Sequence, residues 1–358
     1  MNHHPALYLN EYDMSEQESQ TAALEAWCCH HPEFSPPAGA VAVFRAMPGE
    51  YLQRFDPGQL HCLQGYRPLA DELTRRGYFL QEALTGPVEL AIVLATKHKE
   101  EVLSNVAQAV TSLKEGGSLL VAAANDLGAA SLERRCRESV GPVETYSKHK
   151  CRVFRVIKDS ARLDRELLSD WLKAGELRCI PATGLYACPG LFSWKTIDPG
   201  SRLLAQHLPA DLAGRGADLG AGYGFLSREA LKRAPGIREL HLFEAERKAL
   251  QAAALNLADD GNRVTLQFHW ADVTAGLGMK GLDFVLMNPP FHAGRGALPS
   301  LGRAFVQVAL AAVRPGGQVF MVANRHLPYE AEIEAAHGQV QGVVQQEGFK
   351  IMRIRKGR

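Results

Sequence analysis

Short apolar runs alternate along this chain with segments of helix-forming residues. The runs have the length and apolar content of buried strands, and they cover residues 88–94, 239–243, 264–268 and 282–287. Residues 226–232 and 158–173 have the composition of helices. Strands that alternate with helices form parallel sheets connected by right-handed crossovers. The pattern therefore predicts an α/β fold.

A faint internal repeat divides the chain into two halves. Residues 113–125 resemble residues 313–324, residues 151–158 resemble 351–356, and the run 88–94 parallels 282–287. We expect two tandem Rossmann-like domains, at residues 1–160 and 181–358, with a linker at 161–180. The alternative is two unrelated α/β domains with similar Gly-Gly turns. Residues 158–173 read as a connecting helix, and 176–200 as a short hairpin that covers a bound cofactor or touches the substrate.

The run 282–287 stops abruptly at Asn288-Pro289-Pro290-Phe291. Proline cannot donate to a sheet ladder, so the strand ends there and Asn288 lies at its carboxyl edge. Ligands bind at this edge in open α/β sheets. The Asn288 amide, the Pro289 carbonyl and a flat Phe291 ring suit a planar group with an exocyclic amine. A plain Pro-Pro turn after a strand is the alternative.

A glycine loop precedes this strand. Gly220, Gly222 and Gly224 follow Asp218 at alternate positions, and a predicted helix begins directly after them. Glycine lacks Cβ and tolerates positive φ, so such a loop lets a ligand approach the backbone closely. The spacing differs from the dinucleotide fingerprint, and no Gly-Lys-Ser/Thr follows as in a P-loop. An ordinary turn is the alternative.

Two carboxylates follow the next two predicted strands. Glu244 ends the run 239–243, at about the spacing at which a carboxylate binds ribose hydroxyls in nucleotide-binding units. Glu246 is an alternative for that position. Asp272 follows the run 264–268, where it could accept a hydrogen bond from an adenine amino group. Each carboxylate taken singly is also compatible with a solvated loop.

This ordered set resembles the class I S-adenosylmethionine-dependent methyltransferases, and Asn288-Pro289-Pro290-Phe291 resembles their amino-methylating branch. Two further segments narrow the resemblance, namely residues 190–204 and residues 322–329. Both are similar to the bacterial ribosomal RNA guanine-N2 methyltransferases, a family with one type for the small and one for the large ribosomal subunit. The resemblance covers about residues 178–358. It departs at Glu244, where that family more often has Asp.

The resemblance implies a class I methyltransferase fold in both halves, with the N-terminal one degenerate. That half lacks a glycine loop, and its corresponding strand continues as Ala95-Thr96-Lys97. The expected activity is transfer of a methyl group from S-adenosyl-L-methionine to a guanine N2 amine, in ribosomal RNA or a ribosomal subunit. The cofactor would be bound by Asp218, Gly220, Gly222, Gly224, Glu244, Asp272 and Asn288. Alternatives are N-methylation of adenine or a protein glutamine amide, and a non-catalytic RNA-binding or ribosome-assembly protein.

The expected chemistry follows from what these residues offer. The guanine amine is a poor nucleophile, because its lone pair is delocalised into the ring. The Asn288 side-chain oxygen and the Pro289 carbonyl could accept its two N–H bonds and stabilise the developing positive charge. Phe291 would stack on a base taken out of its helix. Pro290 completes the expected catalytic set, whereas His292 reads as a loop histidine.

Composition places few further limits on function. The 358 residues carry a net charge of +1, so RNA binding requires a local basic face. Candidate basic groups, each also compatible with solvated surface, are residues 134–155 and the tail from Lys350 to Arg358. Seven scattered cysteines form no CxxC pattern, which indicates neither a zinc site nor a disulfide framework. No signal peptide or membrane-length apolar run is evident, so we expect a cytoplasmic protein without metal; the pattern leaves the oligomeric state open.

Overall fold

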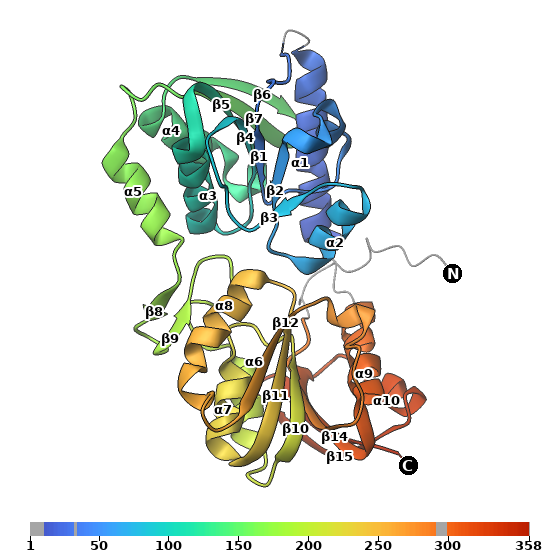
Figure 1. Cartoon of the computed structure of the whole chain (residues 1–358). Coiled ribbons are helices and arrows are strands. Elements are labelled where there is room, and N and C mark those ends of the chain that lie inside the picture. The colour runs from blue at the N-terminus through green and yellow to red at the C-terminus, as the bar shows by residue number, and fades with distance from the viewer. Residues whose placement is uncertain (1–10, 32–33, 291–298, 358) are drawn as a thin grey trace. The chain divides into compact units, whose positions relative to one another are not determined.

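The computed structural model describes residues 11–31, 34–290 and 299–357. The chain divides into two compact units, the first comprising Met1–Glu176 with Cys188–Gly190 and the second comprising Leu177–Ala187 with Leu191–Arg358. Each unit contains one mixed seven-stranded sheet covered by helices on both faces (Figure 1). The expected α/β class with two Rossmann-like units is confirmed.

The sheet of the first unit has the strand order β3-β2-β1-β4-β5-β7-β6. Neighbouring strands are parallel as far as β5, and β7 runs antiparallel to both β5 and β6. The strands are β1 Val41–Phe44, β2 Leu60–Leu63, β3 Leu80–Gln81, β4 Val88–Leu94, β5 Leu113–Ala124, β6 Val143–Lys148 and β7 Cys151–Ile157. The α-helices are α1 Glu11–His30, α2 Arg67–Arg75, α3 Lys99–Ser112, α4 Ala129–Ser139 and α5 Arg165–Ala174.

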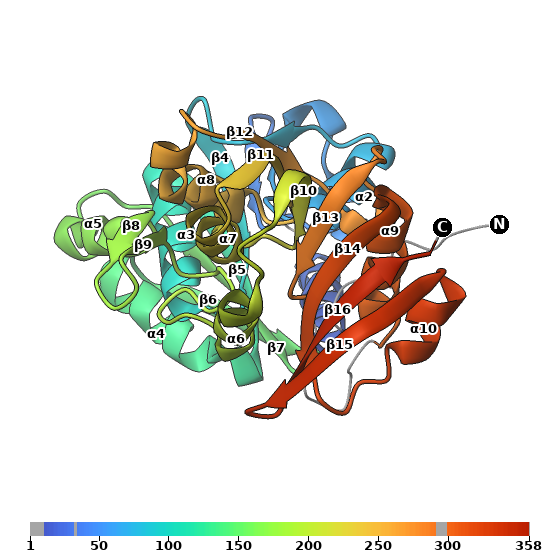
Figure 2. The same cartoon turned by 90° about the horizontal axis from the view of Figure 1, so that it is seen from below.

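The second unit repeats this order as β12-β11-β10-β13-β14-β16-β15. Its strands are β10 Ala213–Leu219, β11 Gly236–Glu244, β12 Thr265–Trp270, β13 Leu282–Met287, β14 Val313–Asn324, β15 Gly338–Gln346 and β16 Phe349–Lys356. Its α-helices are α6 Pro199–His207, α7 Phe225–Arg233, α8 Arg247–Asn256, α9 Pro299–Ala312 and α10 Glu330–Ala335. A separate hairpin, β8 Arg178–Ile180 and β9 Leu185–Ala187, precedes the sheet, and the long β15–β16 hairpin forms its far edge (Figure 2).

Each sheet separates two hydrophobic cores. In the second unit, α6, α7 and α8 pack on one face, and α9 and α10 pack on the other (Figure 1). In the first unit, α1 and α2 cover one face, while α3, α4 and α5 cover the other. The central strands are buried on both faces, which explains why residues 88–94 and 282–287 are apolar almost throughout.

Strand register relates the two units residue by residue. Val41 of β1 and Gly216 of β10 occupy equivalent positions, and the residues opposite them also correspond: Leu60 with Leu240, and Leu90 with Phe284. Both sheets also have a register shift at the same place, between β4 and β5 and between β13 and β14. The internal repeat in the sequence therefore corresponds to a repeat in topology and register.

The structure differs from the expected linker at residues 161–180. Helix α5 begins at Arg165, because the Asp164 side chain accepts a hydrogen bond from the backbone N–H of Leu167 and caps it. Leu168 and Trp171 are buried in the core of the first unit beside α3, so α5 is part of that unit. The intermittent leucines of this segment mark a packed helix face rather than a free connection.

Within the ranges described above, no helix is both long and apolar enough to cross a membrane.

Candidate active site

Parallel strands bring the predicted site residues to one edge of the second sheet. Leu219 of β10 lies between Phe243 of β11 and Met287 of β13. All three strands run in the same direction, so the glycine loop, Glu244 and Asn288 follow them at the same carboxyl edge. The sheet topology thus unites segments that lie up to seventy residues apart.

The glycine loop is built from left-handed backbone. Gly220, Gly222 and Gly224 have φ angles of 70°, 54° and 83°, which favour glycine. A Cβ on Gly222 would meet no atom within 4 Å, so the loop is open there. A Cβ on Gly224 would lie 3.1 Å from the Cβ of Ala253, where the loop approaches α8. The loop thus combines an open backbone surface with close packing at its end.

Glu244 holds the glycine loop in place. One carboxylate oxygen accepts from the backbone N–H of Gly222 at 2.8 Å, and the other accepts from the N–H of Glu246 at 2.9 Å. Burial raises the pKa of Glu244, while these two backbone hydrogen bonds oppose that shift. Glu246 is the N-cap residue of α8, and its own side chain makes no capping bond.

Asp218 is fully buried at the end of β10. Its Oδ2 accepts from the Ser227 hydroxyl at 2.8 Å, whereas its Oδ1 has no hydrogen-bond partner among the described residues. Burial raises the pKa of Asp218 to about 7, and the nearby Glu244 charge acts in the same direction. A buried carboxylate oxygen without a partner costs free energy of folding, and such groups are concentrated at functional sites.

Asn288 is oriented by two residues of the α6 N-terminus. Its Nδ2 donates to the Asp198 carboxylate at 2.9 Å and to the Ser201 hydroxyl at 2.8 Å. Asp198 also caps α6 by accepting from the backbone N–H of Ser201. Both amide hydrogens of Asn288 are therefore occupied, which leaves its side-chain oxygen to accept from a ligand.

Pro289 and Pro290 follow as irregular backbone, the first buried and the second exposed. Phe291 and His292 lie outside the described residues, so their roles stay predictions. Asp272 lies two residues beyond β12, where its Oδ1 accepts from the backbone N–H and the hydroxyl of Thr274. The structure thus places Asp272 at the same sheet edge, one strand further from Asn288 than Glu244 is.

Sequence reasoning missed the roles of Asp198 and Ser201 in the site. The signal was present, because Asp followed by Pro-Gly-Ser is typical of a helix N-terminus. A capping residue is normally read as structural, however, and only the fold brings it to Asn288. The sequence predicts a hairpin at 176–200 that covers the cofactor or touches the substrate, but it assigns no site role to Asp198 or Ser201.

The basic groups proposed from the sequence are partly engaged within the protein. Arg137 and Arg152 both pair with Glu133, and Lys350 pairs with Glu330 at 2.6 Å. These cations stabilise their own units, so their number overstates the charge offered to RNA. No group of three or more potential metal ligands occurs among the residues whose placement is described.

Comparisons with known proteins identify the family of this chain. Residues 182–353 match the family model for the methyltransferase small domain. The ribosomal RNA small subunit methyltransferase C of Shewanella baltica is 32% identical over 248 residues, which cover 68% of this chain and 69% of that protein. The chain belongs to the ribosomal RNA small subunit methyltransferase C family. The enzyme of the same name from Shewanella loihica is 36% identical over 191 residues, covering 53% of this chain and 54% of that one.

The fold likeness extends over both units of this family member. A T. thermophilus 16S rRNA N2 G1207 methyltransferase, solved in complex with AdoMet and guanosine, superposes with a TM-score of 0.76. It is 22% identical and covers 94% of this chain and 91% of its own. At this identity the likeness concerns the fold alone. The family resemblance and the tandem methyltransferase fold inferred from the sequence are confirmed.

Proposed function

We propose that this protein transfers a methyl group from S-adenosyl-L-methionine to the N2 amine of a guanine in small-subunit ribosomal RNA. The observation that carries the proposal is the orientation of Asn288. With its amide N–H bonds held by Asp198 and Ser201, its oxygen can accept from an exocyclic amine. Membership of the family and the likeness to a guanine-N2 methyltransferase support the choice of base.

The second unit has the features that the cofactor requires. Gly222 leaves backbone open to a close approach, and the orphaned Oδ1 of Asp218 can accept from the cofactor's amino-acid part. Glu244 retains lone pairs for ribose hydroxyls after accepting its two backbone bonds. The Oδ2 of Asp272 is the candidate acceptor for the adenine amine. When bound, the cofactor supplies an electrophilic methyl group.

The residues of the chain would act by positioning and electrostatics. Asn288 and the carbonyl of Pro289 would accept the two N–H bonds of the amine, which turns its lone pair towards the methyl group. Asp198 is a positioning residue, since its negative charge fixes the Asn288 amide in one orientation and strengthens the oxygen as an acceptor. The amine nitrogen would bond to the methyl group as the methyl–sulfur bond breaks and leaves its electron pair on the sulfur. The methylated amine, now more acidic, would then lose its proton to solvent, so no strong base is needed.

Two measurements test the proposal. Calorimetry should detect S-adenosylmethionine binding to the full chain, and an absence of binding would remove the enzyme hypothesis. Labelled methyl transfer to ribosomal RNA from a strain lacking the gene should yield N2-methylguanosine on nucleoside analysis. Recovery of N6-methyladenosine would overturn the base assignment, and methylated glutamine in a ribosomal protein would overturn the RNA substrate. Free 16S RNA and assembled ribosomal particles should be compared as substrates.

A further inference from the structure

Exposed aromatic and cationic side chains gather on the segment that precedes the catalytic sheet. Phe192 is 66% exposed and Tyr186 of β9 is 40% exposed, although large aromatic side chains are normally buried. Trp194, two residues after Phe192, is half-buried, and Lys195 beside it is exposed. We call Tyr186, Phe192 and Trp194, together with Arg178 and Lys195, the aromatic platform.

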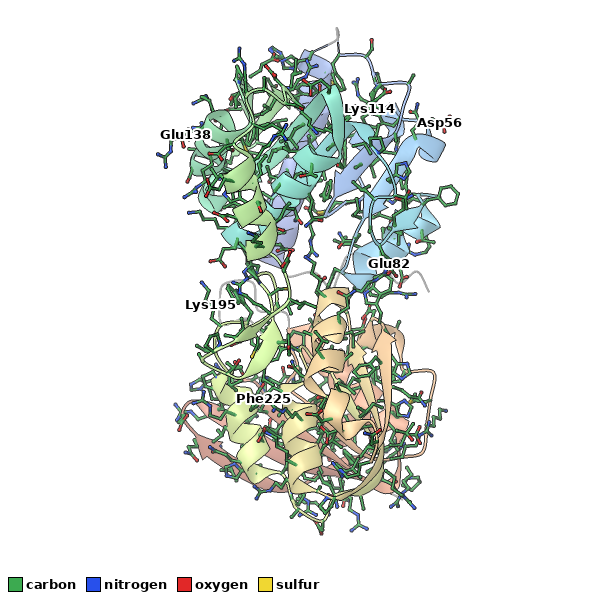
Figure 3. The ribbon with its side chains drawn as sticks, turned by 60° about the vertical axis from the view of Figure 1, so that its left-hand side comes forward. Asp56, Glu82, Lys114, Glu138, Lys195 and Phe225 are labelled. Carbon is green, nitrogen blue, oxygen red and sulfur yellow. The ribbon has the colours of Figure 1, made fainter. Side chains whose placement is uncertain are left out.

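The cations of the aromatic platform lie over one of its rings. The Arg178 guanidinium is 5.4 Å from the centre of the Trp194 ring, and the Lys195 ammonium is 4.7 Å from it. Figure 3 labels Lys195 at the outer side of this segment. Positive charge is thus held over the Trp194 ring, two residues from the exposed Phe192 ring. Cations near an exposed ring suit an anionic chain of stacking bases.

The aromatic platform is fixed to the glycine loop. The Asn256 side chain bridges Tyr186 and Tyr223, accepting from the Tyr186 backbone N–H at 2.7 Å and donating to the Tyr223 carbonyl at 2.8 Å. The Tyr223 hydroxyl donates to the Ser193 carbonyl at 3.4 Å. Tyr223 lies between Gly222 and Gly224, so both ends of the platform are attached to the cofactor-binding loop.

The same segment leads directly to the catalytic residue. Six residues after Phe192 comes Asp198, which holds Asn288. Six extended residues span at most about 20 Å, which is a distance of a few nucleotides. Backbone conformation also fixes the segment locally, since Ser193 has a φ of 51°. An exposed ring on a fixed segment this close to the site can stack on a base next to the target.

We propose that the aromatic platform binds unpaired nucleotides that flank the target guanine, by stacking on Phe192 and by phosphate contacts of the two cations held over Trp194. The proposal rests on the proposed function and adds the form of the substrate, namely single-stranded RNA. Base–aromatic stacking tolerates any sequence, so the platform would contribute affinity for an open RNA strand rather than the choice of base. Lys195 and Arg178 would face the phosphates, which gives the contact its dependence on salt.

The test measures binding of fluorescein-labelled single-stranded RNA and of the same RNA as a duplex, by anisotropy. Phe192→Ala should weaken single-strand binding about tenfold, because it removes a stacking contact worth about one decade in affinity. Trp194→Ala should also weaken binding, because it removes the ring over which Arg178 and Lys195 are held. Phe192→Tyr keeps the ring and should retain binding. Phe79 in the first unit is 68% exposed, so Phe79→Ala is the matched control and should leave binding unchanged.

Salt dependence gives an independent readout. Lys195→Ala should reduce the slope of log affinity against log salt by about one phosphate contact. Lys280→Ala, at another exposed lysine, is the control and should leave the slope unchanged. In methyl transfer, Phe192→Ala should raise the KM for RNA about tenfold and leave kcat and S-adenosylmethionine affinity near wild-type values. Such a split distinguishes lost RNA contact from a disturbed site.

The outcomes separate the two proposals. If wild-type protein fails to bind the cofactor or to methylate RNA, the proposed function fails. If wild-type protein is active and Phe192→Ala and Trp194→Ala bind single-stranded RNA as it does, the aromatic platform proposal is overturned. A defect confined to assembled ribosomal particles, with normal binding of free RNA, would assign the surface to a ribosomal protein and would equally overturn it.

Discussion

The two sheets are built alike at their amino edges and differently at their carboxyl edges. At the amino edge, Lys114 pairs with Glu89 at 2.9 Å in the first unit, and Arg314 pairs with Asp283 at 2.7 Å in the second. The register places Glu89 and Asp283 at equivalent positions. The two units thus share one ion pair with different side chains.

Further amino-edge contacts follow the same plan. The Lys158 ammonium donates to the Leu113 carbonyl at 2.6 Å, and Lys356 donates to the Val313 carbonyl at 2.9 Å. Each contact joins the end of one strand, β7 or β16, to the start of its neighbour, β5 or β14. They stabilise the fold and have no part in the proposed chemistry, so both units need them equally.

The carboxyl edges have diverged where the cofactor would bind. By register, Val43 occupies the position of Asp218, and Arg45 that of Gly220. A buried valine offers no acceptor, and Arg45 fills the loop with a side chain despite its φ of 55°. Its guanidinium lies 3.7 Å from the Glu101 carboxylate, so the former loop position now serves an internal ion pair.

Gln64 shows how a site residue becomes structural. It occupies the position of Glu244 and likewise accepts from the backbone N–H two residues later, that of Tyr66, at 2.8 Å. Its amide nitrogen donates to the Ala46 carbonyl, where Glu244 accepts from Gly222. The turn contact is thus present in both units, whereas the negative charge of Glu244, which we propose binds the ribose, has no counterpart in the first unit.

The catalytic position corrects the alignment read from the sequence. Register places Leu94, which is 2% exposed, at the position equivalent to Asn288, one residue before the Ala95 expected there. An apolar residue in this place can accept no amine hydrogen. Retained contacts at one edge and lost acceptors at the other support a first unit that keeps the methyltransferase fold without its chemistry.

The largest effect should come from Asn288→Ala. Loss of the oxygen that accepts the amine should reduce methyl transfer at least about a thousandfold, as when a transition-state hydrogen bond is removed. S-adenosylmethionine affinity, measured by calorimetry, should change by less than about threefold. Asn125→Ala, at an exposed amide after β5, is the control. Substantial activity in Asn288→Ala would remove Asn288 from the mechanism.

Exchange of the loop residues should have the next largest effect. Gly220→Arg introduces the first unit's residue at a φ of 70° and should weaken S-adenosylmethionine binding at least about a hundredfold, through strain and filled space. Arg45→Gly in the first unit should leave transfer unchanged and gain no second cofactor site, because Gln64 and Leu94 remain. Calorimetry measures the cofactor affinity of Gly220→Arg and the number of cofactors bound by Arg45→Gly, and a methyl-transfer assay measures the activity of Arg45→Gly. Two bound cofactors in Arg45→Gly would refute the loss of function in that unit.

The hydrogen bonds that orient the Asn288 amide should raise kcat by about ten- to a hundredfold. Asp198→Ala should lower kcat about ten- to a hundredfold, and Ser201→Ala less, because Ser201→Ala keeps the carboxylate acceptor whereas Asp198→Ala keeps only the weaker hydroxyl acceptor. Asp198→Ala also removes a helix cap worth about 1 kcal/mol. Asp164→Ala removes the corresponding cap of α5 and isolates that loss of stability. An equal kcat for Asp164→Ala and Asp198→Ala would make Asp198 merely structural.

Sequence alone predicted those parts of the molecule that depend on local pattern. Strands at 88–94 and 282–287 were predicted with their observed bounds, because buried parallel strands are continuous apolar runs. The positions of Glu244 and Asp272 at strand ends also follow from local signals. The contact of Glu244 with Gly222 does not, since Gly222 lies in the loop after a different strand.

Contacts made by the fold could not be predicted. Asn288 and Asp198 lie ninety residues apart, and only the packing of α6 on the sheet brings them together. The correct alignment of Leu94 with Asn288 likewise required strand register, because a one-residue slip leaves the apolar pattern of a doubly buried strand unchanged. The burial of α5 could not be predicted either, because it requires packing against α3, and the leucines of α5 do not indicate which helix they contact.

The smallest effect tests whether Gln64 is now structural. Gln64→Glu would place a carboxylate oxygen against the Ala46 carbonyl in a buried setting and should destabilise the first unit by about 1 kcal/mol. Folding should raise the pKa of the new carboxyl, since its protonated form can still donate to Ala46. The destabilisation should therefore be small at about pH 4, below the ordinary Glu pKa, and reach its full size by about pH 7. Hydrogen exchange of first-unit peptides at both pH values measures it, and unchanged protection would contradict this reading of Gln64.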